Sequence, residues 1–226
     1  MNKIKEKNIT NLEKKSEKPK EDKPERICRS CGKTFSPPAN DYLGLYHDGF
    51  CKILCRTIYY TIPLRFLKIR TDKQSLLESS IDKSLFITGK AGTGKSVFMA
   101  NLAVKRMTTK QGNIEWISYP AFIMKLQGAF QKDRESPFDI AENIARHYGY
   151  LFIDDLGAEK LTDYVRQITY FIINEREQRV LPTVITSNFT LQEIAEQIDV
   201  RISSRIAGMC EVLKFTGVDQ RIKRQT

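Results

Sequence analysis

The chain has 226 residues, 41% of them hydrophobic, which is enough for one domain of ordinary size and a small second one. No apolar run reaches the length of a membrane span and the N-terminus lacks an apolar signal core, which predicts a soluble, cytoplasmic protein without a membrane partner. The net charge of +10 lies outside residues 71–200, which carry fifteen Lys and Arg against seventeen Asp and Glu; this favours contact with a polyanion such as DNA, with solubility alone as the alternative.

The segment before the first cysteine has the composition of an unstructured arm. Residues 1–27 are rich in Lys, Glu, Asn and Ser and contain few apolar residues. Such a segment buries too little apolar surface to offset the entropy lost on folding. We therefore expect a disordered charged arm, which either contacts a partner or has no partner at all.

Four of the five cysteines cluster in residues 28–56, as one C-x2-C pair and one C-x3-C pair. The sequence Gly-Lys-x-Phe after the first pair resembles a zinc-ribbon knuckle, in which the glycine permits the tight turn under the metal. In a cytosolic chain this clustering favours metal over disulfides. We expect a zinc module, with His47 able to replace one thiolate and with plain thiols in a helical segment as the alternative. The expected ligands are Cys28, Cys31, Cys51 and Cys55.

A linker and lead-in helix are expected over residues 57–84. The stretch 62–70 within it is both basic and apolar. Long basic side chains can cover apolar surface with their stems while their charge stays in water. This stretch therefore either packs on the domain that follows, which is the commoner case, or meets a partner.

The sequence GKAGTGKS at 89–96 matches the phosphate-binding loop G-x-x-x-x-G-K-[ST]. An apolar run that predicts a buried strand precedes it, and a helical apolar pattern follows it, as the motif requires. Glycines let backbone N–H groups face phosphate oxygens, and the helix N-terminus adds partial positive charge. Lys95 would reach the β- and γ-phosphates, and the Ser96 hydroxyl would bind Mg²⁺. The expected phosphate-binding residues are Gly89, Lys90, Ala91, Gly92, Thr93, Gly94, Lys95 and Ser96.

Strands and helices alternate from this loop onward, which predicts an α/β fold with a parallel sheet. The patterns place a strand at 114–118 and helices at about 121–132 and 137–147. Later elements are expected as a helix at 163–179, a strand at 182–186, a helix at 191–197, a helix from 201 that Gly208 ends, and a strand at 211–215.

A second nucleotide motif is the apolar run at 150–153 that ends in Asp154 and Asp155. A strand that ends in acid places carboxylates at the carboxyl edge of the sheet, beside the phosphates. Asp154 would hold Mg²⁺, directly or through water, and Asp155 would orient or deprotonate the attacking water. The alternative is a polar turn without a ligand.

A polar residue, Asn188, also follows the predicted strand at 182–186. From there its side chain can reach the γ-phosphate or the attacking water. The alternative is that Asn188 caps the helix at 191–197.

Four segments of the core resemble the bacterial AAA+ helicase loaders of the DnaC/DnaI type and the related IstB transposition helpers. They are LFIDDLGAEK (151–160), INER (173–176), LPTVITSN (181–188) and RISSRI (201–206). The resemblance covers roughly residues 70–222 and implies a P-loop AAA+ (ASCE) three-layer core with a parallel five-stranded sheet, within a domain at 85–226. It also implies ATP at subunit junctions, completed by an arginine of the neighbouring subunit in a homo-oligomer.

By position, the resemblance assigns that arginine to Arg205, with Arg201 one turn earlier facing the same junction. It makes Asn188 a sensor of the γ-phosphate, and it places Arg221, in the C-terminal tail, near the nucleotide. It also places DNA contacts after the second strand, where Tyr119, Phe122, Lys125 and Phe130 occur, although such aromatics are more often core.

The resemblance implies an ATP-dependent loader of a replicative DNA helicase that binds single-stranded DNA and hydrolyses ATP with Mg²⁺. Two departures are the short N-terminal region and the pair Asp154-Asp155, in place of the Asp-Glu of many AAA+ ATPases, which suggests slow, switch-like hydrolysis. Two alternatives are an IstB-like transposition helper and an adaptor whose zinc module binds the partner while ATP acts only as a conformational switch.

Overall fold

The computed structural model of the chain describes residues 25–30, 32–36, 50, 52–109, 113–129 and 136–219. Its centre is a five-stranded sheet in which every neighbouring pair of strands is parallel. In spatial order the strands are β4 (Ile114–Ser118), β5 (Tyr150–Leu156), β6 (Thr183–Ser187), β3 (Leu85–Thr88) and β7 (Glu211–Lys214). The predicted α/β fold with a parallel five-stranded sheet is therefore confirmed.

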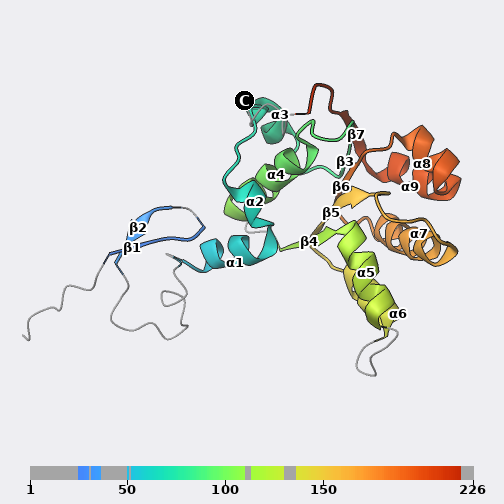
Figure 1. The fold of residues 1–226 in the computed structure, drawn as a ribbon, viewed down its shortest axis with the longest axis horizontal. Coiled ribbons are helices and arrows are strands. Elements are labelled where there is room, and N and C mark those ends of the chain that lie inside the picture. The colour runs from blue at the N-terminus through green and yellow to red at the C-terminus, as the bar shows by residue number, and fades with distance from the viewer. Residues whose placement is uncertain are drawn as a thin grey trace, which may run out of the picture.

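Helices cover both faces of this sheet, because the strands are apolar on both sides. Along β3, the side chains of Leu85 and Ile87 join one buried cluster and Phe86 joins the other. The first face packs against α1 (Ile53–Thr61), α2 (Leu64–Leu67), α3 (Gln74–Ser79) and α4 (Lys95–Thr109). The second face packs against α5 (Tyr119–Ala129), α6 (Pro137–Ala145), α7 (Asp163–Gln178), α8 (Leu191–Gln197) and α9 (Val200–Met209), as Figure 1 shows.

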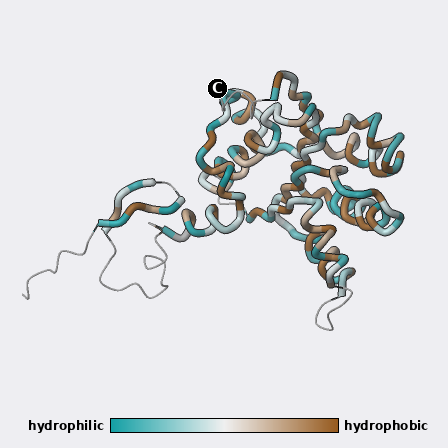
Figure 2. The backbone as a smooth tube through the Cα atoms, viewed as in Figure 1, coloured by the Kyte–Doolittle hydropathy of each residue, from teal (hydrophilic) through white to brown (hydrophobic). Residues whose placement is uncertain are grey.

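The apolar core accounts for most of the stability of this arrangement. Figure 2 shows hydrophobic residues concentrated along the central strands. Phe86, Phe98 and Phe152 are fully buried, and burying a side chain of that size stabilises a fold by about 1.5–3 kcal/mol. In the described ranges, we find no helix long and apolar enough to cross a membrane.

Polar caps define where three helices of the second face begin. Ser136 and Asp139 form a reciprocal capping box at the start of α6, and Pro137 occupies its first turn. Thr162 caps α7. Thr190 forms a capping box with Glu193 at the start of α8, so the alternative role of Asn188 as the cap of this helix is wrong.

Several expected elements differ in detail. The lead-in segment at 57–84 forms two short helices, α2 and α3, where one was expected. Its first residues belong to the end of α1. Gly208 does not end α9, which continues to Met209 with Cys210 as its C-cap, since glycine is tolerated within a helix. Tyr119 and Phe122, expected as DNA contacts or core, are 1% and 6% exposed and belong to the core. Phe130 lies outside the described residues.

The described N-terminal residues form a small two-stranded ribbon. The two-residue strands β1 (Arg26–Ile27) and β2 (Thr34–Phe35) pair antiparallel. The turn between them is closed by a hydrogen bond from Gly32 N to Cys28 O at 2.9 Å, with Gly32 at φ +72°. The side chains of Cys28 and Cys55 are both buried in one cluster with Phe50.

Candidate nucleotide site

The phosphate loop joins the carboxyl end of β3 to the first turn of α4. Gly89, Gly92 and Gly94 have φ values of +150°, +76° and +94°, which side chains rarely adopt, and a Cβ on Gly89 would collide with the carbonyl oxygen of Phe215. The glycines therefore permit a backbone that a substituted chain could not adopt. Such a loop turns N–H groups toward one point in front of a 15-residue helix, an arrangement that binds phosphate.

The ammonium group of Lys95 is held beside this loop. Its Nζ donates hydrogen bonds to Gly89 O at 2.6 Å, Lys90 O at 2.9 Å and Asn188 Oδ1 at 2.9 Å. The side chain is buried, so its charge is screened little by water. These contacts fix a positive charge at the mouth of the loop, where a phosphate would lie.

Asp154 accepts two hydrogen bonds on a single carboxylate oxygen. Ser96 Oγ donates to Asp154 Oδ1 at 2.7 Å, and Thr186 Oγ1 donates to the same oxygen at 2.8 Å. Burial raises the pKa of Asp154 above its ordinary value, and these two hydrogen bonds oppose that rise. A buried carboxylate beside a hydroxyl suits Mg²⁺, a hard cation that would repay the cost of burying the charge. Ser96 and Asp154 therefore lie together as expected for magnesium ligands.

A bulge in β5 brings Asp155 into the same site. The pairing of β5 with β6 shifts register between Ile153 and Leu156, and Asp155 lies in this irregularity with φ +67°. Successive side chains of a regular strand point to opposite faces, so without the bulge Asp154 and Asp155 could not both face the loop. The Asp155 N–H donates to Thr186 Oγ1 at 2.9 Å, and Asp155 Oδ1 accepts from Asn188 Nδ2 at 3.3 Å.

Thr186 is a site residue that the sequence analysis missed. Its hydroxyl donates to Asp154 and accepts from the backbone of Asp155, so one buried group orients both acids. The available signal was the polar run Thr186-Ser187-Asn188 at the end of an apolar strand, of which only Asn188 was singled out.

A cavity of about 390 Å³ opens between the phosphate loop and the lead-in segment. Loop residues, Asp155 and Asn188 line one side, and Arg65, Phe66 and Ile69 line the other. The stretch at 62–70 thus packs on the core, which was the commoner of the two expected cases. The positive charge of Arg65 also lowers the pKa of Asp154, against the larger rise caused by burial. A cavity with cations and carboxylates at one end and apolar side chains at the other suits a nucleotide.

The remaining predicted nucleotide ligands lie away from this cavity. Arg201 and Arg205 are on α9, and their guanidinium groups lie 4.8 Å and 4.7 Å from the ring centre of Tyr170 on α7. Arg221 lies outside the described residues. The tail does reach the loop two residues earlier, because a Cβ on Gly92 would collide with the carboxylate of Asp219.

The zinc site is only partly within the described chain. Cys31, Cys51 and His47 fall outside it, and no group of three or more potential metal ligands occurs among the residues that are described. The two described cysteines of the predicted set, Cys28 and Cys55, do meet in one buried cluster although 27 positions apart. Zinc binding stays a prediction.

No protein-family model matches the chain. A sequence relative, the replicative helicase loader DnaI of Bacillus subtilis, is 28% identical over 122 residues, which are 54% of this chain and 38% of the relative. The match therefore spans less than half the length of that protein.

Solved structures share the fold at low sequence identity. A crystal structure of DnaI has a TM-score of 0.57 at 22% identity and covers 71% of this chain and 94% of its own. The DnaC helicase loader has a TM-score of 0.56 at 18% identity, over 71% and 99%. The replication initiator DnaA bound to AMPPCP and single-stranded DNA has a TM-score of 0.52 at 15% identity, over 67% and 49%. By fold and by sequence, the chain resembles the AAA+ proteins of the DnaC/DnaI helicase-loader type, as its motifs predicted.

Proposed function

We propose that this chain is an ATP-dependent loader of a replicative DNA helicase. The observation that carries the proposal is the convergence of Lys95, Asp154, Asp155 and Asn188 at the carboxyl edge of the sheet. All of them but Asp154 line the cavity beside the phosphate loop, and Asp154 is hydrogen-bonded to Ser96, which also lines it. The likeness to a helicase loader supports the choice among ATP-driven functions. A cytoplasmic location follows from this role.

The chemistry of the site suits ATP bound with Mg²⁺. The metal would neutralise phosphate charge and would be held by Ser96 and Asp154. The N–H groups of the loop and the ammonium of Lys95 would bind the phosphates. Asp155 and Asn188 lie within hydrogen-bond distance of each other, so they would orient the attacking water together. The shorter side chain of aspartate in place of glutamate suits slow hydrolysis, which fits a switch.

A second copy of the chain would complete the site. In the described part of the chain, the 390 Å³ cavity is lined by no arginine from α9 of its own chain. Arg205, with Arg201 beside it, would reach the nucleotide of the adjacent copy and stabilise the charge that develops on the γ-phosphate. Arg221, in the tail that contacts Gly92, would approach the nucleotide of its own chain.

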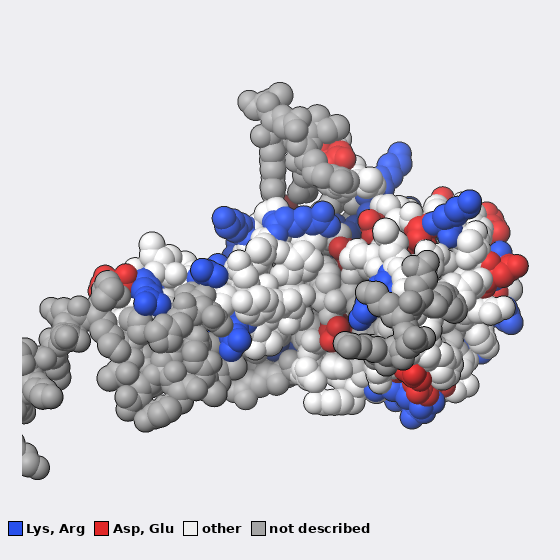
Figure 3. Space-filling view, turned by 60° about the horizontal axis from the view of Figure 1, so that its bottom comes forward, with Lys and Arg blue, Asp and Glu red and all other residues white. Residues whose placement is uncertain are grey.

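Single-stranded DNA binding would depend on basic side chains more than on stacking by aromatic ones. Figure 3 shows Lys and Arg in small groups over the described part of one face, with Asp and Glu mixed among them at the right of the view. With Tyr119 and Phe122 in the core, binding would depend on these cations and on the basic ends of the chain. Single-stranded DNA binding should therefore weaken steeply with salt.

A loading assay tests the function. The full chain is mixed with the replicative helicase of its own host, closed circular single-stranded DNA and Mg²⁺–ATP, and helicase retained on the circles is measured. We expect retention that depends on ATP and is lost with Lys95→Ala. Recovery of a transposase and no helicase from the host, together with no gain in helicase retention, would refute the proposal and favour the transposition helper.

Metal analysis of the same purified protein tests the zinc module. We expect one zinc per chain, lost when Cys28 and Cys55 are both replaced by serine. A protein that retains full helicase binding without zinc would show that the metal has no part in the partner contact.

A further inference from the structure

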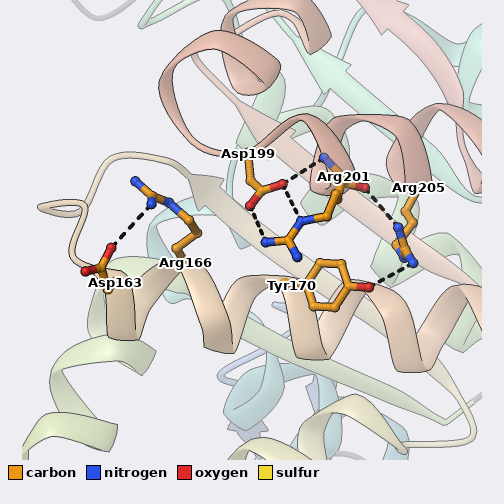
Figure 4. A network of polar contacts seen from close by, with 6 residues as sticks. All are labelled: Asp163, Arg166, Tyr170, Asp199, Arg201 and Arg205. Carbon is orange, nitrogen blue, oxygen red and sulfur yellow. Dashed lines mark hydrogen bonds and ion pairs between the residues drawn. The ribbon is translucent and has the colours of Figure 1, made fainter.

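The guanidinium group of Arg205 is held by two side chains of α7. Arg205 Nε donates to Asn174 Oδ1 at 2.9 Å, and Nη2 donates to the Tyr170 hydroxyl at 2.9 Å. The same guanidinium lies 4.7 Å from the centre of the Tyr170 ring. Figure 4 shows Tyr170 projecting from α7 toward both arginines of α9. A flexible side chain is thus fixed by contacts along its charged end.

Arg201 is held in a different way. Its Nε and Nη2 donate to the two carboxylate oxygens of Asp199, at 3.1 Å and 2.8 Å, and Arg201 lowers the pKa of Asp199 (Figure 4). The charge of Arg201 is therefore already paired within its own helix end. Arg205 has a looser ion pair, in which its Nε lies 3.6 Å from a carboxylate oxygen of Glu177, beyond the usual length of a hydrogen bond.

The hydrogen bonds of Arg205 leave part of its guanidinium available. An arginine has five N–H donors. Besides Asn174 and Tyr170, the acceptor that Arg205 has among the described residues is the Arg201 carbonyl, at a long 3.4 Å from Nη1. Two N–H groups can still bind an oxygen that approaches from outside the subunit, and the side chain is 26% exposed.

We propose that Tyr170 and Asn174 are positioning residues, which hold Arg205 in the orientation from which it reaches the nucleotide of the adjacent copy, while Asp199 keeps Arg201 paired. This inference rests on the proposed function, in which Arg205 acts in trans. The two short hydrogen bonds go to neutral acceptors, which restrain the guanidinium without cancelling its charge, and the ion pair with Glu177 is longer than a hydrogen bond. Little conformational freedom therefore remains to be lost when the subunits meet. A carboxylate in the same place would hold the arginine but would compete with the phosphate for it.

The test is steady-state ATP hydrolysis by the full chain over a range of protein concentrations. Arg205→Ala is the reference. Tyr170→Leu removes both the ring and the hydroxyl, and Tyr170→Phe removes the hydroxyl alone. Asn174→Leu removes the amide acceptor. Arg166→Ala is the matched control, because Arg166 lies on the same face of α7 but pairs with Asp163 at 3.3 Å. Circular dichroism and unfolding in urea identify any variant that does not fold.

We expect kcat to fall about tenfold for Tyr170→Leu and Asn174→Leu, with a smaller fall for Tyr170→Phe. The KM for ATP should stay within about twofold, because none of these residues lines the cavity. Arg205→Ala should reduce kcat at least as much, and Arg166→Ala should leave it unchanged. If Tyr170→Leu fails to fold, Tyr170→Phe and Asn174→Leu decide the question by the same criteria.

Mixing two variants distinguishes a loss of Arg205 positioning from a loss of activity through misfolding. Tyr170→Leu protomers have a complete phosphate loop, and Lys95→Ala protomers have an undisturbed Arg205. An equimolar mixture should regain turnover per Tyr170→Leu protomer, because the neighbour supplies the arginine. No recovery in the mixture would overturn the inference. So would a fall in kcat of less than twofold in both Tyr170→Leu and Asn174→Leu while Arg205→Ala is strongly impaired. If Arg205→Ala itself retained full turnover, the trans arginine of the proposed function would fail with it.

Discussion

The two ends of the sheet hold buried charge in opposite ways. At the amino end, Arg176 is fully buried and its five N–H groups make five hydrogen bonds. The acceptors are the Thr183 hydroxyl and the carbonyl oxygens of Ala145, His147, Gly149 and Pro182, at 2.7–3.2 Å. Burial lowers the pKa of Arg176 to about 10, which leaves it charged at neutral pH.

At the carboxyl end, Lys95 and Asp154 are also buried, but they lie beside a cavity: Lys95 lines it, and Asp154 is hydrogen-bonded to Ser96, which lines it too. Asp154 receives both of its hydrogen bonds on one oxygen, so the carboxylate can still bind a cation with the other. A buried charge whose hydrogen bonds are all made by the fold, such as that of Arg176, is structural. A buried charge beside a cavity, with bonding capacity left, suits a ligand.

We expect the largest change in stability from replacing Arg176, at the amino end of the sheet. Arg176→Met would remove one donor from each of four carbonyl groups and a hydroxyl, so we expect the free energy of unfolding to fall by about 3–5 kcal/mol. Arg176→Lys, with three donors in place of five, should lose less. Urea unfolding followed by circular dichroism measures both. A loss below about 1 kcal/mol for the methionine variant would mean that the guanidinium network contributes little.

At the carboxyl end of the sheet, we expect removal of the buried charge to stabilise the fold, opposite to the loss expected for Arg176 at the amino end. Asp154→Asn should raise the free energy of unfolding of the nucleotide-free protein by about 0.5–2 kcal/mol at pH 7, because the amide keeps an oxygen for Ser96 and Thr186 without a buried charge. The same variant should lose Mg²⁺-dependent ATP binding.

The pH dependence of this difference follows from the raised pKa of Asp154. The folded protein holds that proton more tightly than the unfolded chain, so ionisation lowers stability as pH rises through the raised pKa. Below the ordinary value of 3.8 the carboxyl is neutral in both states, and the gain from asparagine should vanish. A gain of equal size at pH 3 and pH 7 would contradict this account. Mg²⁺ binding by the unmodified protein should also weaken as pH falls, since the metal competes with the proton.

The smallest effect concerns the bulge at Asp155. Its φ of +67° is accepted by asparagine and disfavoured for alanine, so Asp155→Ala should be about 1 kcal/mol less stable than Asp155→Asn. Both variants should lose ATP turnover, which removes loss of function as a reason for the stability difference. Equal unfolding midpoints for the two variants would show that the positive φ carries no strain.

The two ends of the sheet also differ in how much of each could be predicted from the sequence. The phosphate loop, Asp154 and Asn188 could be found because their chemistry lies in side chains and glycines at fixed spacing beside apolar runs. The role of Arg176 could not, although it lies in a motif, because most of its acceptors are backbone carbonyl groups 27–31 positions away, at the end of α6 and in the turn after it, and any residue type can supply a carbonyl. Arg65 was missed for a related reason, since its place beside the cavity depends on how α2 packs on α4.

Binding of Mg²⁺–ATP to the unmodified chain and to Lys95→Ala, measured by titration calorimetry with Lys105→Ala as the control, tests the central claim most directly. Lys105 lies on the same helix but pairs with Glu78 at 3.0 Å, far along α4 from the loop. Loss of a charged hydrogen-bond donor to phosphate costs about 1.5–3 kcal/mol, so affinity should fall roughly tenfold to more than a hundredfold in Lys95→Ala alone. Unchanged affinity and turnover in Lys95→Ala would contradict the assignment of the nucleotide to this loop.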